Sequence, residues 1–282
     1  MAEWDRNTPW RQGHLLTPET TNALGIQHPE SPEKTAVVVI SHDCDLAQTC
    51  ANEPSVEVLV GRFIEELHGN YMHSKNLRKL HLPYTRGEQQ CVVELLATGK
   101  LVLPKAGEVG LVSHQPEPKF QLGPNEQAIL QSWLAARYRR AAFPDEFDRR
   151  LNDETGLRDR LVKILKLHGL HIPAIFFDVD EGEEAKRNGP DDVYTLTIYL
   201  LYTTHTDPEL AESEAKKAKD AIEAAFKKEC RDENGKWRWI ELRDCDVMAD
   251  TAMTYHQSVV LKKWQADHVS LRGDPPQEMI VV

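Results

Sequence analysis

Four consecutive β-branched residues, 37–40 (VVVI), constrain the fold of this chain more than any other feature. A β-strand points alternate side chains to opposite faces, so a run that is apolar at every position predicts a strand buried on both sides. The polar sequence SHDCDL, residues 41–46, follows directly. We therefore expect a core strand whose end carries a dense group of reactive side chains.

Three further strands are expected in the N-terminal half, which predicts a small, mostly β region. They lie at residues 55–60, 81–84 and 91–96, the last of which has the pattern of either a strand or a short helix. Glycine and proline recur from 104 to 124, as is typical of a boundary. We place two domains at residues 1–118 and 119–282.

Helical and strand patterns are mixed in the C-terminal half. Apolar spacing predicts helices at 125–143, 157–168 and 208–230 and strands at 172–179, 193–204 and 237–242. The first two of these strands flank a polar acidic loop and should form a hairpin. The predicted fold class is α+β, with a mostly β, barrel-like N-terminal half followed by helices and a mixed α/β C-terminal half.

Composition narrows the class of protein. Hydrophobic residues make up 40% and charged residues 28% of the 282 residues, which predicts a globular chain. No apolar stretch approaches the roughly 20 residues of a membrane span, and the N-terminus lacks the apolar core of a secretory signal, so we expect no membrane partner and a cytoplasmic location. Five cysteines without a CxxC pair predict reduced thiols.

The SHDCDL sequence supplies the candidate catalytic residues His42, Asp43, Cys44 and Asp45. Continued strand geometry would put His42 and Cys44 on one side and the two aspartates on the other. His42 with Cys44 could hold a soft metal, or Cys44 could act as a nucleophile activated by an imidazole. In the alternative interpretation, Cys44 packs as a small apolar residue and His42 caps the turn.

Asp43 and Asp45 also form one of three Asp-x-Asp triplets, the others being at 178–180 and 244–246. Two carboxylates on one side of an extended chain can bind a divalent cation such as Mg²⁺. Asp43 and Asp45 are therefore candidate metal ligands. Aspartates are also common where strands end and turns begin, so a purely structural role is the competing interpretation.

An arginine-rich segment, 136–150, offers a second candidate site. Arg137 lies on the apolar face of the predicted helix and should be buried against carboxylates, for which Asp43 and Asp45 are candidates. Arg137, Arg139 and Arg140, together with Ser41, are predicted ligand-binding residues for phosphate or nucleic acid. Arg149 and Arg150 belong to the same segment, where intervening acids favour a solvated ion-pair network instead.

The order of four segments resembles the strand sequence of PemK/MazF-type barrels: WRQGHLL, VVVISHDCD, PSVEVLVGR and ELLATGKLVLPK. The resemblance covers about the first 110 residues and implies an SH3-like fold used by toxin ribonucleases and by binding modules. The usual arginine after the family's first strand has no sure counterpart, since Arg11 precedes Gly13. As a whole, the chain also resembles bacterial proteins with an SHDCD-type turn.

Three functions follow as hypotheses. The first is a bacterial accessory or defence-associated protein whose barrel-like half binds nucleic acid or a nucleotide, although the formal net charge of -11 requires a local basic patch for that role. The second is a phosphoesterase that uses a divalent metal bound by Asp-x-Asp carboxylates. The third is a noncatalytic module that binds a protein partner. Sequence alone does not decide whether the protein is an enzyme.

Overall fold

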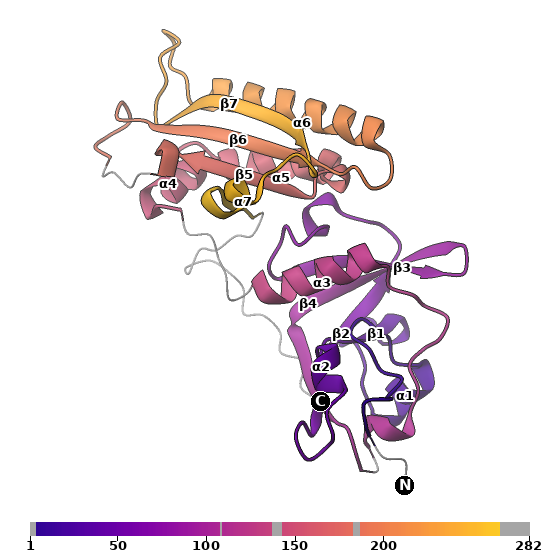
Figure 1. Cartoon of the computed structure of the whole chain (residues 1–282). Coiled ribbons are helices and arrows are strands. Elements are labelled where there is room, and N and C mark those ends of the chain that lie inside the picture. Colours follow the sequence, from indigo (N-terminus) through magenta and orange to yellow (C-terminus); the bar gives the residue numbers. More distant parts are fainter. Residues whose placement is uncertain (1–3, 108, 137–142, 183–186, 266–282) are drawn as a thin grey trace. The chain divides into compact units, whose positions relative to one another are not determined.

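The structure is a computed structural model and describes residues 4–107, 109–136, 143–182 and 187–265. The chain divides into two compact units (Figure 1). The first contains the described parts of Met1–Leu67 and Leu77–Ala135, and the second contains those of His68–Asn76 and Ala136–Asp267. The sequence predicts a boundary between two domains after residue 118. Compact units are defined by contacts and not by independent folding, so this domain boundary stays a prediction.

The N-terminal unit is built on a four-stranded antiparallel sheet in the order β1-β2-β4-β3. Its strands are β1 Thr35–Val39, β2 Ser55–Ile64, β3 Lys79–Arg86 and β4 Gln89–Pro104. Each strand predicted in this half is present. The segment 91–96, whose pattern suited a strand or a helix, lies within β4.

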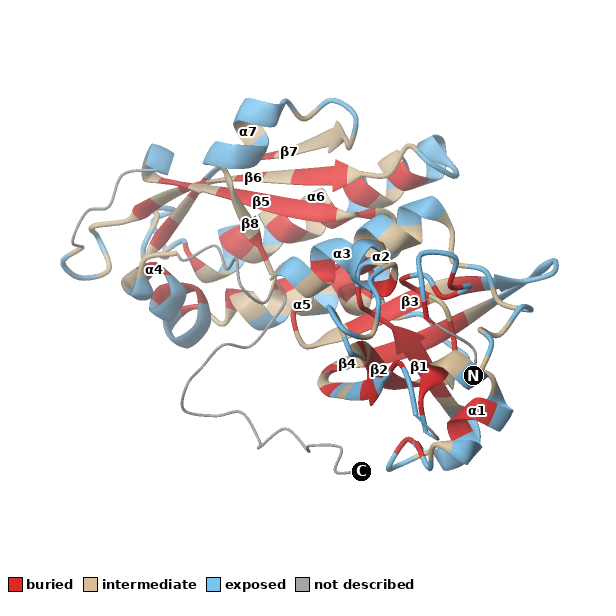
Figure 2. Cartoon of the chain, turned by 60° about the horizontal axis from the view of Figure 1, so that its bottom comes forward, coloured by how far each residue is buried: buried red, intermediate tan, exposed pale blue. Residues whose placement is uncertain are grey.

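Strand β1 is buried on both faces, as the run of β-branched residues predicts. Ala36 and Val38 lie in a cluster with Leu130 and Trp133, which come from helix α3, Pro124–Ala136. On the other face, the two remaining valines of β1 pack with Trp10 and other residues that precede or follow the sheet. Figure 2 shows β1 and its neighbours mainly in the colour of buried residues.

The two edges of this sheet are extended by single bridges. Leu15 pairs with Val38 at the free edge of β1, and Gln121 pairs with Thr85 at the free edge of β3. Leu16 and Pro116 form a bridge between these two added segments. The described strands nevertheless form an open sheet and no closed barrel, so the likeness to a PemK/MazF-type barrel stays a prediction.

The C-terminal unit contains a mixed sheet in the order β7-β6-β5-β8. Its elements are α4 Asp145–Arg149, α5 Leu157–His168, β5 Ala174–Val179, β6 Tyr194–Tyr202, α6 Pro208–Glu229, β7 Ile240–Ala249, α7 Tyr255–Val260 and β8 Lys262–Trp264. The hairpin β5–β6 is antiparallel, as predicted, whereas β6 and β7 are parallel and are joined by α6. The α+β class is confirmed.

Helix α6, which packs on the C-terminal sheet, begins and buries one face as its sequence predicts. Asp207 caps its N-terminus by accepting a hydrogen bond from the Leu210 backbone N–H (3.0 Å), and Pro208 occupies the first turn. One face is fully buried through Ala211, Ala215, Ala218, Ile222 and Phe226. Helices α5 and α6 share the hydrophobic core of one sheet face (Figure 1).

Two sequence-based boundaries need correction or restriction. Strand β7 begins at Ile240 and runs to Ala249, so it is longer than the predicted 237–242, and Asp244 and Asp246 lie inside the strand rather than after it. Helix α3 ends at Ala136 among the described residues, and the rest of the predicted helix lies outside them.

In the part of the chain that the structure describes, no helix could span a membrane. The cytoplasmic location stays a prediction.

The loop between β2 and β3 crosses into the C-terminal unit. Gly69 packs so closely on α5 that a Cβ atom there would lie 2.3 Å from the Leu165 carbonyl oxygen. Asn70 donates a hydrogen bond to the Val162 carbonyl (3.0 Å). Lys75 is completely enclosed and donates hydrogen bonds to the Gly169 carbonyl and to the Ile172 carbonyl (2.8 Å). A lysine from the N-terminal half thus satisfies carbonyls that follow α5.

Burial and the nearby Lys263 hold the pKa of Lys75 well below its usual value. The unfolded chain therefore binds more protons than the folded chain as the pH rises toward the unfolded pKa of about 10.4, and stability increases over this range. We expect Lys75→Met to abolish this gain, because methionine does not titrate. Urea unfolding of both proteins between neutral and alkaline pH measures the difference.

The exposed Lys166 of α5 supplies the matched control for this experiment. Lys166→Met should leave the pH dependence of the unfolding free energy parallel to that of the wild type, whereas Lys75→Met should flatten it by up to about 1.4 kcal/mol per pH unit. Parallel curves for Lys75→Met would contradict the assignment of a suppressed pKa to this lysine.

Candidate functional site

The SHDCDL sequence forms a short helical turn, not a continuation of β1. The strand ends at Val39, and helix α2 spans Asp43–Leu46. Strand parity therefore does not apply, and the predicted separation of His42 and Cys44 from the aspartates is wrong. The His42 side chain caps the turn through Nδ1, which accepts a hydrogen bond from the Cys44 backbone N–H (3.2 Å). Local capping decides the geometry here.

Other side chains hold the turn against the sheet. The Ser41 hydroxyl is buried and accepts a hydrogen bond from the Glu57 backbone N–H (2.8 Å). The Asp43 carboxylate accepts one from the Gln12 backbone N–H (2.8 Å). Lys105 donates to the carbonyls of Asp45 (2.6 Å) and Gln48 (3.0 Å). Ser41 and Asp43 thus have structural partners within the N-terminal unit.

The exposed side of the turn presents His42, Cys44 and Asp45. The capping role predicted for His42 is confirmed, whereas the alternative of Cys44 packed as a small apolar residue is wrong because its thiol is exposed. Within the described ranges, no three His, Cys, Asp or Glu side chains gather into a metal-binding group. Metal binding by Asp43 and Asp45, and catalysis by residues of this turn, stay predictions.

The other Asp-x-Asp triplets lie in the C-terminal sheet. Asp178 of β5 and Asp244 of β7 both pair with Thr197 of the intervening strand β6. Two strand spacings place their backbones roughly 10 Å apart. Among the described residues, neither carboxylate belongs to a group of three or more His, Cys, Asp or Glu side chains that could hold a metal ion.

Four charged or ionisable residues on three strands form a group that sequence reasoning missed, which we call the cross-strand cluster: Arg62 of β2, Lys79 and His81 of β3, and Glu94 of β4. Glu94 pairs with both Arg62 and His81 in the strand register. One carboxylate oxygen lies 2.9 Å from Arg62 Nη2, and the other lies 3.0 Å from Lys79 Nζ and 3.1 Å from His81 Nε2.

Burial differs sharply within the cross-strand cluster. The side chains of Glu94 and His81 are 8% and 5% exposed, whereas those of Arg62 and Lys79 are each 28% exposed. The hydrogen bond with His81, followed by those from the surrounding cations, lowers the pKa of Glu94 to about 2. The carboxylate is therefore ionised at neutral pH and fixes two cations at the protein surface.

A weak signal for this cluster exists in the sequence. Glu94 interrupts the apolar stretch CVVELLA, and His81 interrupts KLHLP, both inside predicted strands. A charge in an otherwise apolar strand needs a partner. The partners of Glu94 can be identified only once the register of strand pairing is known, because Arg62, His81 and Glu94 are well separated along the chain.

The arginine-rich segment is described only in part. Arg137, Arg139 and Arg140 lie outside the described residues, so their predicted ligand-binding role and the predicted contact of Arg137 with the turn stay predictions. Arg149 and Arg150 both form ion pairs with Glu146 at 2.8 Å, but the predicted solvated network holds only for the half-exposed Arg149, because the Arg150 side chain is fully buried.

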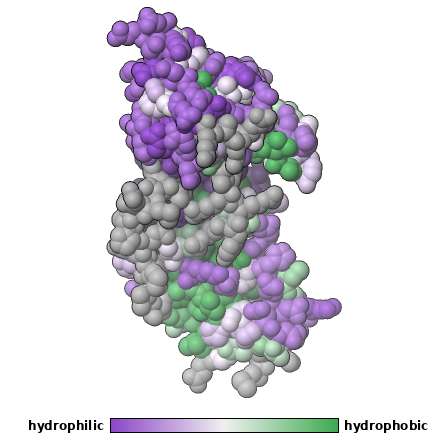
Figure 3. Space-filling view, turned by 90° about the vertical axis from the view of Figure 1, so that its left-hand side faces the viewer, coloured by the Kyte–Doolittle hydropathy of each residue, from purple (hydrophilic) through white to green (hydrophobic). Residues whose placement is uncertain are grey.

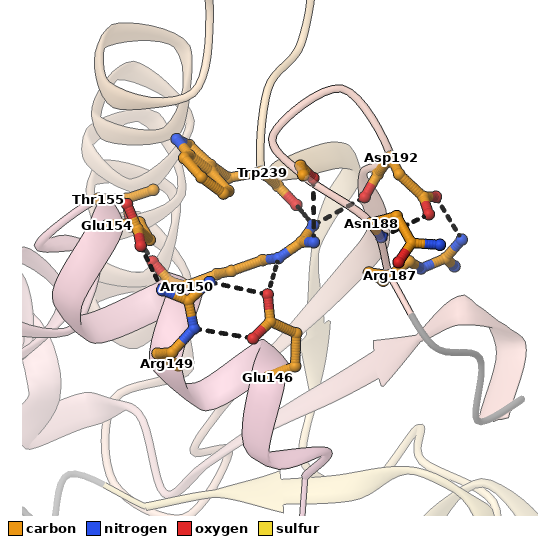
Figure 4. Close-up of polar contacts among 10 residues, drawn as sticks. Glu146, Arg149, Arg150, Glu154, Thr155, Arg187, Asn188, Asp192 and Trp239 are labelled. Carbon is orange, nitrogen blue, oxygen red and sulfur yellow. Dashed lines mark hydrogen bonds and ion pairs between the residues drawn. The ribbon is translucent and has the colours of Figure 1, made fainter.

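Arg150 has the buried environment that the sequence had suggested for Arg137. Its side chain is fully enclosed and donates to carbonyls of Asp192 (2.7 Å), Trp239 (3.1 Å) and Gly189 (3.1 Å). The rings of Tyr194 and Trp239 lie 5.1 Å and 5.4 Å from its guanidinium. Figure 4 shows the guanidinium pointing toward these loops, so Arg150, directly after α4, connects this part of the chain to the segments that precede the parallel strands β6 and β7.

Replacement of Arg150 should destabilise the C-terminal unit strongly. Arg150→Met removes the donor of the Asp192 and Gly189 carbonyls and one of the two donors of the Trp239 carbonyl, and each buried acceptor left unsatisfied costs about 1–3 kcal/mol. Arg149→Met removes a half-exposed arginine from the same carboxylate and should destabilise the unit much less, because ion pairs at the surface contribute little. Chemical denaturation distinguishes the two; equal effects would contradict the proposed difference in burial.

Thiol labelling should separate the five cysteines, all of which lie among the described residues as free thiols. Cys44 is exposed, whereas burial raises the pKa of both Cys230 and Cys245 to about 12. We expect Cys44 to react first with a disulfide reagent in native protein, and the two buried cysteines to react only after unfolding. Mass spectrometry of tryptic peptides, with Cys44→Ser as control, identifies the labelled sites.

The candidate residues thus fall into three places: the capped SHDCDL turn and the cross-strand cluster in the N-terminal unit, and the buried arginine of the C-terminal unit. The SHDCDL turn and the buried arginine are held by hydrogen bonds, whereas the cross-strand cluster combines a buried carboxylate with partly exposed cations. No protein-family model, curated protein or solved structure matches the chain.

Proposed function

We propose that the N-terminal unit binds the phosphate groups of a nucleic acid or nucleotide at the cross-strand cluster. The observation that carries this proposal is the attachment of two partly exposed cations, Arg62 and Lys79, to one buried carboxylate. Because Glu94 holds both side chains in place, little conformational entropy remains to be lost when a ligand binds. Arginine and lysine are the side chains that most often contact phosphate oxygens.

Arg62 has a donor that a phosphate can use without breaking this arrangement. Its Nε and Nη2 atoms contact Glu94, whereas Nη1 contacts Glu30 at 3.0 Å. The Glu30 side chain is 62% exposed, so this outer ion pair is weak and easily exchanged. A phosphate oxygen replaces the Glu30 carboxylate at Nη1, while Glu94 continues to orient the guanidinium.

The overall charge of the chain makes this binding local and dependent on salt. A formal net charge of -11 disfavours general attraction to a polyanion, so the contact is restricted to the cluster. Its cellular role would be that of a bacterial accessory or defence-associated protein, the role suggested by the resemblance of the first half to PemK/MazF-type proteins. Binding rather than catalysis is proposed, because the low pKa of Glu94 makes it a poor general base at neutral pH.

Fluorescence anisotropy with labelled single-stranded RNA and with labelled ATP tests the proposal and distinguishes polymer from nucleotide. At low salt, we expect Arg62→Ala to weaken binding by about tenfold or more and Glu30→Gln to strengthen it by about threefold, because the competing carboxylate is lost. Binding should fall steeply by about 200 mM salt.

Matched variants on the same sheet serve as controls. Lys100 and Glu57 form an exposed ion pair away from the cluster, so Lys100→Ala and Glu57→Gln should each leave affinity almost unchanged. Circular dichroism and Arg62→Lys check that Arg62→Ala acts on binding rather than folding. The proposal fails if neither probe binds at low salt, or if the Arg62 and Lys100 variants behave alike.

A further inference from the structure

A cavity of about 300 Å³ lies in the N-terminal unit, between the start of β1, helix α1 (Pro18–Ala23) and the segment that ends at Phe120. Its apolar wall includes Leu15, Ile26, Phe63 and Phe120. Its size and mixture of apolar walls with a few polar groups are those of a small-molecule site. None of the residues of the cross-strand cluster lines it.

The walls of the cavity are fixed by hydrogen bonds. Thr17 caps α1 by accepting a hydrogen bond from the Thr20 backbone N–H (3.1 Å). Leu16 N–H bonds to the Val37 carbonyl (2.9 Å), and Glu117 N–H bonds to the Leu15 carbonyl (2.8 Å). The cavity is therefore formed before any ligand enters, which lowers the entropic cost of binding.

Charge selects the kind of ligand that fits. The lining includes two carboxylates, Glu33 and Glu117, and no lysine, arginine or histidine. Neither carboxylate forms a salt bridge with any residue in the described ranges. One Glu117 oxygen accepts a hydrogen bond from the Lys119 backbone N–H (3.1 Å), which helps to orient it. An anion such as phosphate is repelled here, whereas a cation is attracted.

The aromatic wall complements this charge. Phe63 and Phe120 pack with their ring centroids 5.2 Å apart at an angle of 32°. The guanidinium of Arg86 lies 5.4 Å from the centre of the Phe120 ring, so one face of this ring is already in cation–π contact, and the other wall of the cavity is left for the body of a ligand. An apolar ligand body against these rings would also be removed from water.

We propose that this cavity binds a small organic amine in its protonated form. The ammonium group lies near the carboxylates of Glu33 and Glu117, and the hydrocarbon or aromatic body contacts Phe63 and Phe120. This site is separate from the phosphate-binding role proposed for the cross-strand cluster, because it takes the opposite charge and uses different residues.

Calorimetry with ligands of matched shape tests the proposal on the full chain. Tryptamine, tryptophol and indole-3-acetate share one ring system and carry a positive, a neutral and a negative group, respectively; phenethylamine and hexylamine extend the series of amines. We expect tryptamine to bind about tenfold more tightly than tryptophol, equivalent to about 1.4 kcal/mol, and indole-3-acetate not to bind. Failure of all three amines, or equal affinity for tryptamine and tryptophol, overturns the proposal.

Variants locate the binding. Glu117→Gln should reduce tryptamine affinity about tenfold with little effect on tryptophol, and Phe120→Ala should weaken both. Glu88→Gln removes the same charge from the exposed turn between β3 and β4, which does not line the cavity, and should change nothing. Arg62→Ala should likewise leave amine binding intact, so failure of the phosphate proposal would not affect this one. Equal effects of Glu117→Gln and Glu88→Gln would overturn it.

Discussion

A charge removed from water must find partners within the protein, and this requirement organises both units. In the N-terminal unit, Glu94 draws together side chains from β2 and β3. In the C-terminal unit, the guanidinium of Arg150 donates hydrogen bonds to carbonyls of the loops that precede β6 and β7. Each buried charge therefore fixes the conformation of segments that are distant in sequence.

The same requirement separates structural charges from those available to a ligand. Each side-chain nitrogen of the buried Arg150 donates a hydrogen bond inside the protein, so this residue stabilises the fold without offering a contact to solvent. Arg62 is held equally firmly by a buried carboxylate but keeps one nitrogen on an exposed, exchangeable ion pair. The hydropathy surface in Figure 3 is mainly hydrophilic over the C-terminal unit, while apolar residues gather on part of the N-terminal unit.

Periodicity predicted the regular elements well, because α5, α6 and β1 each bury a face that the sequence marks with apolar residues. It failed for SHDCDL, where a histidine cap converts the end of a strand into a helical turn. It also could not find the cross-strand cluster, since which side chains meet across a sheet depends on register and on the bend of β4. The fold class could therefore be predicted from the sequence, whereas the residues that meet in the candidate sites could be identified only from the three-dimensional structure.

The passage of residues 68–76 into the second unit has a consequence for how the protein is made. Ribosomal synthesis delivers this loop well before residues 162–172, which carry the carbonyls that Asn70 and Lys75 bond. Strands β1 to β4 can pair while the nascent chain is still short, but the lysine ammonium must remain hydrated until α5 has emerged. The N-terminal sheet can thus form first, whereas docking of the loop between β2 and β3 waits for the other half of the polypeptide.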